Sequence, residues 1–210
     1  MRRLTAFIMI VMTTGAIASL FGRIWYILAI SAGLLGVIVS GIFGRTSFRE
    51  CGLAPADIAA GLAAKKILLL AVAPLILIAC EVWIGIRLFP DYINCGLSIL
   101  DRQLIFRGTA TLVLHILFLT IIEEVPWRCF YQLNIGQNFP GIAALILPAA
   151  GITLLTLPLY NTAASAICLL GFFVRRLIWG YLYAESGSVL IVIISHWMTT
   201  LFYLVLLVGI

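Results

Sequence analysis

The sequence predicts an all-α fold: a polytopic membrane helical bundle of about seven transmembrane helices. Of the 210 residues, 64 % are hydrophobic and only 10 % are charged. A soluble domain of this length cannot bury so much apolar side chain, and the mean hydropathy of +1.21 points the same way. Several apolar runs approach the roughly 20 residues that a helix needs to cross a bilayer, whereas the strands of a membrane barrel would alternate in polarity.

The apolar runs are separated by short segments that carry charged, glycine or proline residues. The segment 44–66 is the main hydrophilic connection, and its alanine-rich part, 57–66, is predicted to be a short helix at the membrane interface. Because the chain shows no internal repeat, low-complexity tract or linker, we expect a single integral membrane domain over residues 1–210. The predicted spans, in order, are 4–21, 24–43, 67–89, 109–132, 139–157, 162–183 and 188–209.

The basic residues predict the orientation in the membrane. Arg2 and Arg3 precede the first span, and four more basic residues lie in segment 44–66. Lysine and arginine concentrate in cytoplasmic loops, so the N-terminus, segment 44–66 and the turn 185–187 are predicted to be cytoplasmic, in the inner membrane of a bacterial cell. The polar segment 90–107 is predicted to face outward. The net charge of +5 is thereby explained by topology, with the lipid bilayer rather than nucleic acid as the expected partner.

The fourth predicted span carries the motif Glu123-Glu124-Val-Pro-Trp-Arg128. Carboxylates in hydrocarbon cost several kcal/mol unless they are paired, neutralised or hydrated, so these acids indicate a functional site. Glu124 and Arg128 are four residues apart on one helix face and are predicted to form an ion pair. Glu123 has no such partner on its own helix and is predicted to be the spare carboxylate, although it could instead be a neutralised buried acid or an interfacial one. Pro126 removes a backbone donor and is predicted to kink the helix.

Other ionisable residues within the spans also need partners. Arg175 and Arg176 are adjacent, so they cannot both face lipid, and at least one is expected to meet an acid such as Glu81 or Glu124. A structural role is favoured for Glu81. His115 is expected to be a packing histidine, because it lies two helical turns before Glu123 and cannot reach it along one helix.

The EExxxR motif, followed by His196 in the last span, resembles the CAAX-protease and bacteriocin-processing (CPBP, or Abi) family of intramembrane glutamic-type proteases. That family shows three marks: EExxxR, then FxxxH, then HxxxN or HxxxD. Glu123, Glu124 and Arg128 match the first mark in full. Residues 177–196, with a glycine-bearing helix and a Ser-Gly turn before the last helix, look like the family's approach to the third mark. The resemblance covers a core of about residues 67–205.

The chain departs from the family pattern at two places. The second mark is degenerate, because Pro158 stands where its histidine is expected. The third mark ends in Thr200 instead of asparagine or aspartate. The resemblance therefore implies the fold of an intramembrane protease more firmly than it implies protease activity.

The resemblance implies a role for each matched residue. Glu123 would be the base that activates water, and Glu124 with Arg128 would hold the helix in place. His196 would orient the water or stabilise the oxyanion, with the Thr200 hydroxyl as a donor in place of the usual amide. The implied substrate is a membrane-associated protein or peptide. No cofactor is expected; a divalent metal between Glu123 and His196 stays an alternative, although the chain has no HExxH motif.

Two other classes of function compete with an intramembrane endopeptidase. One is a catalytically weak or inactive relative that acts as a membrane peptide-binding or immunity protein. The other, less favoured, is a small-solute or proton-coupled transporter. Because fold alone does not determine function, the site has to distinguish these classes. A protease requires Glu123 and His196 to share one site, whereas a binding protein does not.

Overall fold

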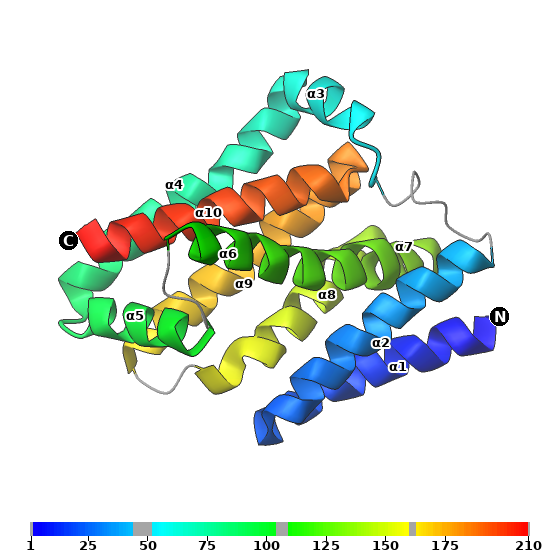
Figure 1. The fold of residues 1–210 in the computed structure, drawn as a ribbon, viewed down its shortest axis with the longest axis horizontal. Coiled ribbons are helices and arrows are strands. Elements are labelled where there is room, and N and C mark those ends of the chain that lie inside the picture. Colours follow the sequence, from blue (N-terminus) through cyan, green and yellow to red (C-terminus); the bar gives the residue numbers. More distant parts are fainter. Residues whose placement is uncertain (1, 44–51, 104–108, 160–162, 210) are drawn as a thin grey trace.

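The computed structural model describes residues 2–43, 52–103, 109–159 and 163–209, and these residues form helices and turns without any strand (Figure 1). This confirms the all-α prediction. A π-helical segment, Val125–Gln132, directly follows α6, and two 3-10 turns lie at Ser19–Phe21 and Leu157–Leu159. The α-helices are α1 Arg2–Ala18, α2 Arg23–Ile42, α3 Ala56–Ala63, α4 Lys65–Leu88, α5 Tyr92–Gln103, α6 Thr109–Glu124, α7 Leu133–Asn138, α8 Gly141–Thr156, α9 Ala163–Ser186 and α10 Val189–Gly209.

Six helices in the described residues are long and apolar enough to cross a membrane, and α8 is a shorter apolar helix of 16 residues. The predicted bundle of about seven helices is therefore confirmed, and the protein is an integral membrane protein. α1 and α2 form a hairpin, while α9 packs against both α4 and α8 (Figure 1). Large apolar side chains lie on the outside of the bundle, as expected for a surface in contact with lipid; Phe7, Ile76 and Val205 are examples.

Three predicted boundaries were wrong. The fourth span does not end at residue 132, because α6, the π-helical segment and α7 form one continuous helix over Ala110–Asn138. The polar residues of segment 90–107 predict a loop, but its described part contains the helix α5. The predicted interface helix 57–66 is divided, because Ala64 takes an extended conformation between α3 and α4.

Segment 52–66 and the turn between α9 and α10 lie at the same end of the bundle. The Ser188 hydroxyl donates to the Gly52 carbonyl over 3.2 Å, and Lys66 pairs with Glu185 at 2.7 Å. Gly52 has a positive φ of 67°, and a Cβ there would come within 2.0 Å of the Gly187 carbonyl oxygen, so only glycine fits. These contacts agree with the prediction that both segments face the same side of the membrane.

α2 lies unusually close to the π-helical segment. A Cβ on Gly33 would stand 2.4 Å from the Cβ of Pro126, and a Cβ on Gly36 would stand 2.7 Å from the Phe130 ring. Small residues permit such backbone approach between membrane helices, where dispersion contacts replace the hydrophobic effect. Tyr26 is two helical turns before Gly33 and shares its face, so this packing brings the tyrosine toward the acidic motif.

A buried ion pair joins α4 to α9. Arg175 pairs with Glu81, and both side chains are at least nine-tenths buried. The expectation that one of the two arginines meets Glu81 is therefore confirmed. The Tyr92 hydroxyl of α5 donates to the same carboxylate over 3.1 Å. Burial raises the pKa of the Tyr92 phenol far above its ordinary value, so the phenol keeps the proton that it donates.

We predict that the two ends of the bundle lie on opposite sides of the membrane, with segment 52–66 in the cytoplasm. In a variant whose five cysteines are replaced by alanine, Lys65→Cys and Asp91→Cys introduce exposed single labels. A membrane-impermeant maleimide added to intact cells should label position 91 and not position 65, because basic residues remain inside. Labelling at position 65 alone would reverse the orientation.

We also predict that Glu81 and Arg175 are strongly coupled. Glu81→Gln or Arg175→Gln alone leaves a buried charge without its partner, a loss of about 3–5 kcal/mol, whereas the double substitution leaves no charge. Thermal unfolding in one detergent should therefore show a smaller decrease in Tm for the double variant than for either single variant. Additive decreases would mean that the pair is not an energetic unit.

Candidate active site

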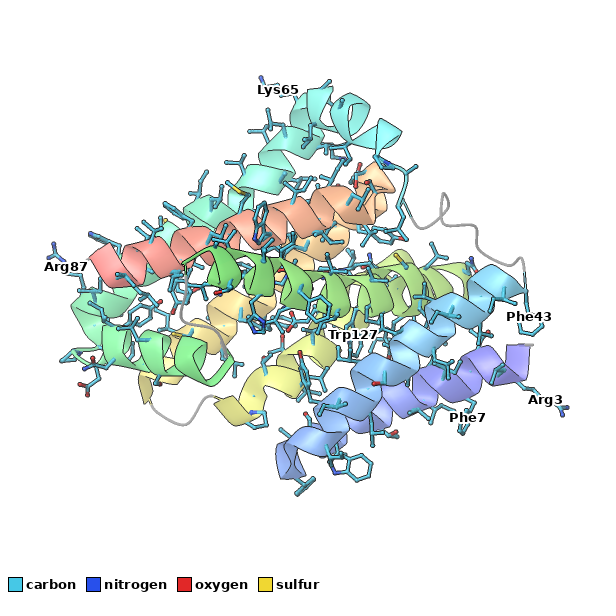
Figure 2. All side chains as sticks on the ribbon, in the orientation of Figure 1. Arg3, Phe7, Phe43, Lys65, Arg87 and Trp127 are labelled. Carbon is cyan, nitrogen blue, oxygen red and sulfur yellow. The ribbon has the colours of Figure 1, made fainter. Side chains whose placement is uncertain are left out.

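Five side chains form a buried charged cluster where α6, the π-helical segment, α9 and α10 meet. We call this set the acid cluster: Glu123, Glu124, Arg128, Arg176 and His196. Figure 2 shows Trp127, next in the chain to Arg128, inside the bundle, whereas Arg3, Lys65 and Arg87 project from its periphery. Glu123 and Glu124 lie near the middle of the continuous helix Ala110–Asn138. The cluster is therefore at membrane depth and away from both helix ends.

The acids lie where the helix changes its winding. Pro126 has no backbone N–H to donate to the carbonyl of Ile122, and the chain takes π-helical turns from Val125 onward. The change from α-helical to π-helical winding therefore begins beside the proline, within a helix that continues to Asn138. The wider turns bury seven successive side chains, from Pro126 to Gln132.

Glu124 and Arg128 form the predicted ion pair, which is confirmed at 2.8 Å with both side chains fully buried. Arg128 also donates to the Gln132 side-chain oxygen over 3.0 Å and to the Arg176 carbonyl over 3.2 Å. Gln132 in turn donates to the Gly180 carbonyl over 2.8 Å. The bonds to the Arg176 and Gly180 carbonyls fix this helix to α9, which fits the holding role expected for Glu124 and Arg128.

Arg176 bridges the two glutamates. Its Nη2 pairs with Glu123 and its Nη1 with Glu124, so the second arginine also meets an acid. The prediction that Glu123 is a spare, unpaired carboxylate was wrong, because its partner comes from α9 and could not be found on its own helix. Glu123 also accepts a hydrogen bond of 3.1 Å from the Tyr26 hydroxyl of α2. Even so, the Glu123 side chain is 12 % exposed and that of Glu124 is fully buried.

His196 completes the acid cluster from α10. Its Nδ1 is 2.9 Å from Glu124 Oε1 and 3.5 Å from Arg176 Nη1. The imidazole lies against the Trp179 ring, with 4.1 Å between ring centroids. Trp179 donates to the Ser195 hydroxyl over 3.1 Å, and Ser195 donates to the Ala71 carbonyl of α4 over 2.7 Å. The imidazole is therefore held at its Nδ1 edge by Glu124 and on one face by Trp179.

The structure does not bring the remaining two residues of the family pattern into the acid cluster. The Thr200 hydroxyl donates to the carbonyl of His196, one turn back on the same helix, over 3.1 Å. Pro158 is exposed on the 3-10 turn that follows α8. The described residues of that turn supply no histidine, and Arg176 is the cation that contacts Glu123 instead.

Two contacts of Glu123 could not be predicted from the sequence. For Arg175 and Arg176 the sequence predicts an acidic partner such as Glu81 or Glu124, but nothing in it indicates the contact of Arg176 with Glu123. Nothing in the sequence indicates that Tyr26 contacts Glu123, because a tyrosine near the start of an apolar helix is common. Among the described residues, no group of three or more histidine, cysteine or acidic side chains is arranged to hold a metal ion. Arg176 lies between the two carboxylates and would repel a cation there, so we propose no metal.

The fold and the cluster define a multi-span helical membrane protein with a buried Glu-Glu-Arg-His site. A family model described as type II CAAX prenyl endopeptidase Rce1-like matches residues 105–202. That stretch contains the whole acid cluster but not Tyr26. The match confirms the resemblance to the CPBP family that the EExxxR motif predicted, and it supports a CAAX-type intramembrane protease as the kind of function. No curated protein and no solved structure matches the chain.

We predict that Glu124→Gln destabilises the protein much more than Glu123→Gln. The first leaves Arg128 without its acid at full burial, a loss of about 3–5 kcal/mol, whereas the second leaves Arg176 still paired with Glu124. Thermal unfolding in one detergent measures the difference. Glu185→Gln, on an exposed carboxylate, is the matched control and should leave Tm nearly unchanged. Equal decreases for both cluster variants would show that the two glutamates are not divided in role.

Proposed function

We propose that the protein is an intramembrane endopeptidase that cleaves a membrane-associated protein or peptide, with Glu123 activating the attacking water. One observation carries the proposal. Of the two glutamates at membrane depth, Glu123 is the one that retains exposure, and it shares the Arg176 guanidinium with His196. A residue that delivers a base to a substrate must be reachable, whereas the fully buried Glu124 is suited to holding other groups.

The chemistry follows from the charges around Glu123. Glu123 accepts a proton from water, and the water oxygen adds to the scissile carbonyl carbon. Glu123 then returns the proton to the amine nitrogen as the carbon–nitrogen bond breaks. Arg176 lies beside the reacting carboxylate, and its Nε is buried without a hydrogen-bond partner among the described residues. A cationic donor beside a developing oxyanion contributes about 10²–10³ in rate, which is the contribution that a second-mark histidine would otherwise supply.

The same contacts limit the base. Arg176 and the Tyr26 hydroxyl both contact the Glu123 carboxylate, so the attacking water must compete with these two donors for its oxygens. We therefore expect slow turnover. This feature, together with the absent second-mark histidine, is also the specific observation that favours the alternative: a catalytically weak or inactive relative that binds a membrane peptide or acts as an immunity protein.

The proposed setting is the bacterial inner membrane with the N-terminus in the cytoplasm. The family description names a CAAX prenyl endopeptidase, so a prenylated peptide with a C-terminal CAAX sequence is the first substrate to test. A bilayer-embedded site fits a substrate that is itself anchored in lipid.

We predict that the purified protein in liposomes cleaves a lipid-anchored peptide and that Glu123→Gln lowers kcat/KM by at least about 10², because the amide cannot accept the proton. Mass spectrometry of the products measures rate and cleavage position. Glu185→Gln, distant from the acid cluster, should keep the wild-type rate. If neither a CAAX peptide nor an unprenylated membrane peptide is cleaved, but both bind saturably, the binding-protein alternative replaces the protease.

A further inference from the structure

We infer that His196 is a hydrogen-bond acceptor through Nε2, because Glu124 holds the imidazole in the tautomer that carries its hydrogen on Nδ1. His196 would then accept a hydrogen bond from the attacking water and would not donate one to the oxyanion. The inference rests on the proposed function of Glu123 and assigns the second polar contact of that water.

The first step is the hydrogen on Nδ1. Nδ1 of His196 is 2.9 Å from Glu124 Oε1, and an ionised carboxylate can only accept. Glu124 is ionised because both Arg128 and Arg176 bind it at full burial. An imidazole nitrogen without hydrogen at that distance would set its lone pair against the carboxylate. Nδ1 must therefore carry the hydrogen and donate it to Glu124.

Arg176 does not change this assignment. Its Nη1 is 3.5 Å from Nδ1, and a donation from the guanidinium would require Nδ1 to be bare. That separation is at the limit of a hydrogen bond, and the carboxylate contact is shorter by more than half an ångström. Nη1 instead directs its charge to Glu124.

The second step is the charge of the ring. The acid cluster contains two carboxylates and two guanidiniums, so it is neutral when His196 is neutral. Protonating Nε2 would add a third cation in a buried setting beside Arg176, which burial disfavours. A neutral ring with its hydrogen on Nδ1 has a lone pair on Nε2. In the described part of the chain, that nitrogen has no hydrogen-bond partner.

The third step is position. Glu123 contacts one terminal nitrogen of Arg176, and His196 lies beside the other. Both residues therefore border the same guanidinium, and Nε2 lies on the side of the imidazole ring away from Glu124, where it can receive a hydrogen bond. Stacking on Trp179 prevents the imidazole from turning away.

The proton balance then closes. One water hydrogen passes to Glu123 as the oxygen bonds to the carbonyl carbon, and the other forms a hydrogen bond to Nε2. When the carbon–nitrogen bond breaks, Glu123 gives its proton to the amine nitrogen. The carboxylic acid product then loses its remaining hydroxyl hydrogen to solvent, so the imidazole stays neutral throughout.

The chain has only two histidines, so ¹⁵N-histidine labelling gives two ring systems. Nuclear magnetic resonance of the labelled protein in lipid bilayers at neutral pH should show His196 with hydrogen on Nδ1 and none on Nε2. The signals are assigned by their loss in His196→Asn. Hydrogen on Nε2, or on both ring nitrogens, would overturn the inference, whether or not a substrate has been found.

A matched pair of substitutions separates the hydrogen bond that Nε2 accepts from the hydrogen bond that Nδ1 donates to Glu124. The asparagine amide of His196→Asn occupies the place of Nδ1 and keeps the donation to Glu124, but it has no counterpart of Nε2. We expect this variant to unfold near the wild-type temperature and to lose at least about 10² in kcat/KM. In His196→Gln the amide reaches toward the place of Nε2, and we expect it to unfold at a lower temperature because Glu124 loses its donor.

These experiments distinguish a failure of the inference about His196 from a failure of the proposed function. If His196→Asn cleaves within threefold of wild type, His196 only holds Glu124 and the inference is wrong, while the proposed function stands. If Glu123→Gln cleaves like wild type, the proposed function is wrong even where the ring spectra agree. If wild type cleaves and Nε2 carries the hydrogen, the inference alone has failed.

Discussion

The bridge that Arg176 makes between Glu123 and Glu124 is the interaction on which the rest of the structure depends. Two adjacent carboxylates at membrane depth repel each other and cannot be hydrated as they would be in water. With Arg128 they form a neutral set of two acids and two guanidiniums. The bundle can bury the set only while α9 stays in place, so the ionic contacts also determine how the helices pack.

This arrangement places the two glutamates of the EExxxR motif in different environments. Glu124 is bound by three groups and is fully buried, whereas Glu123 is bound by one arginine and one tyrosine and keeps some exposure. A water-activating group must change its proton content during the reaction, and a group at the centre of a buried ion network cannot do so cheaply. From this placement we propose different tasks for the two acids, even though their chemistry is the same.

Sequence alone predicted the fold class, the Glu124–Arg128 pair and the need for acids near Arg175 and Arg176, because these follow from hydropathy and from helix periodicity. It could not predict that Arg176 takes both glutamates or that Tyr26 reaches Glu123. Those contacts depend on how separate helices rotate against one another, and apolar membrane helices show little amphipathic pattern from which rotation could be read. The continuation of the helix to Asn138 was missed for a related reason: the polar residues after Gln132 resemble a loop by composition.

The contact between α2 and the π-helical segment has a consequence for how a peptide can reach the site. At Gly33 and Gly36 the two backbones are so close that even a methyl group would collide with Pro126 or Phe130. A peptide cannot pass between two backbones that are packed this closely. Lateral entry between these two elements is therefore excluded at that level of the membrane. Any peptide that reaches Glu123 must approach between other helices, on the side of the site away from α2.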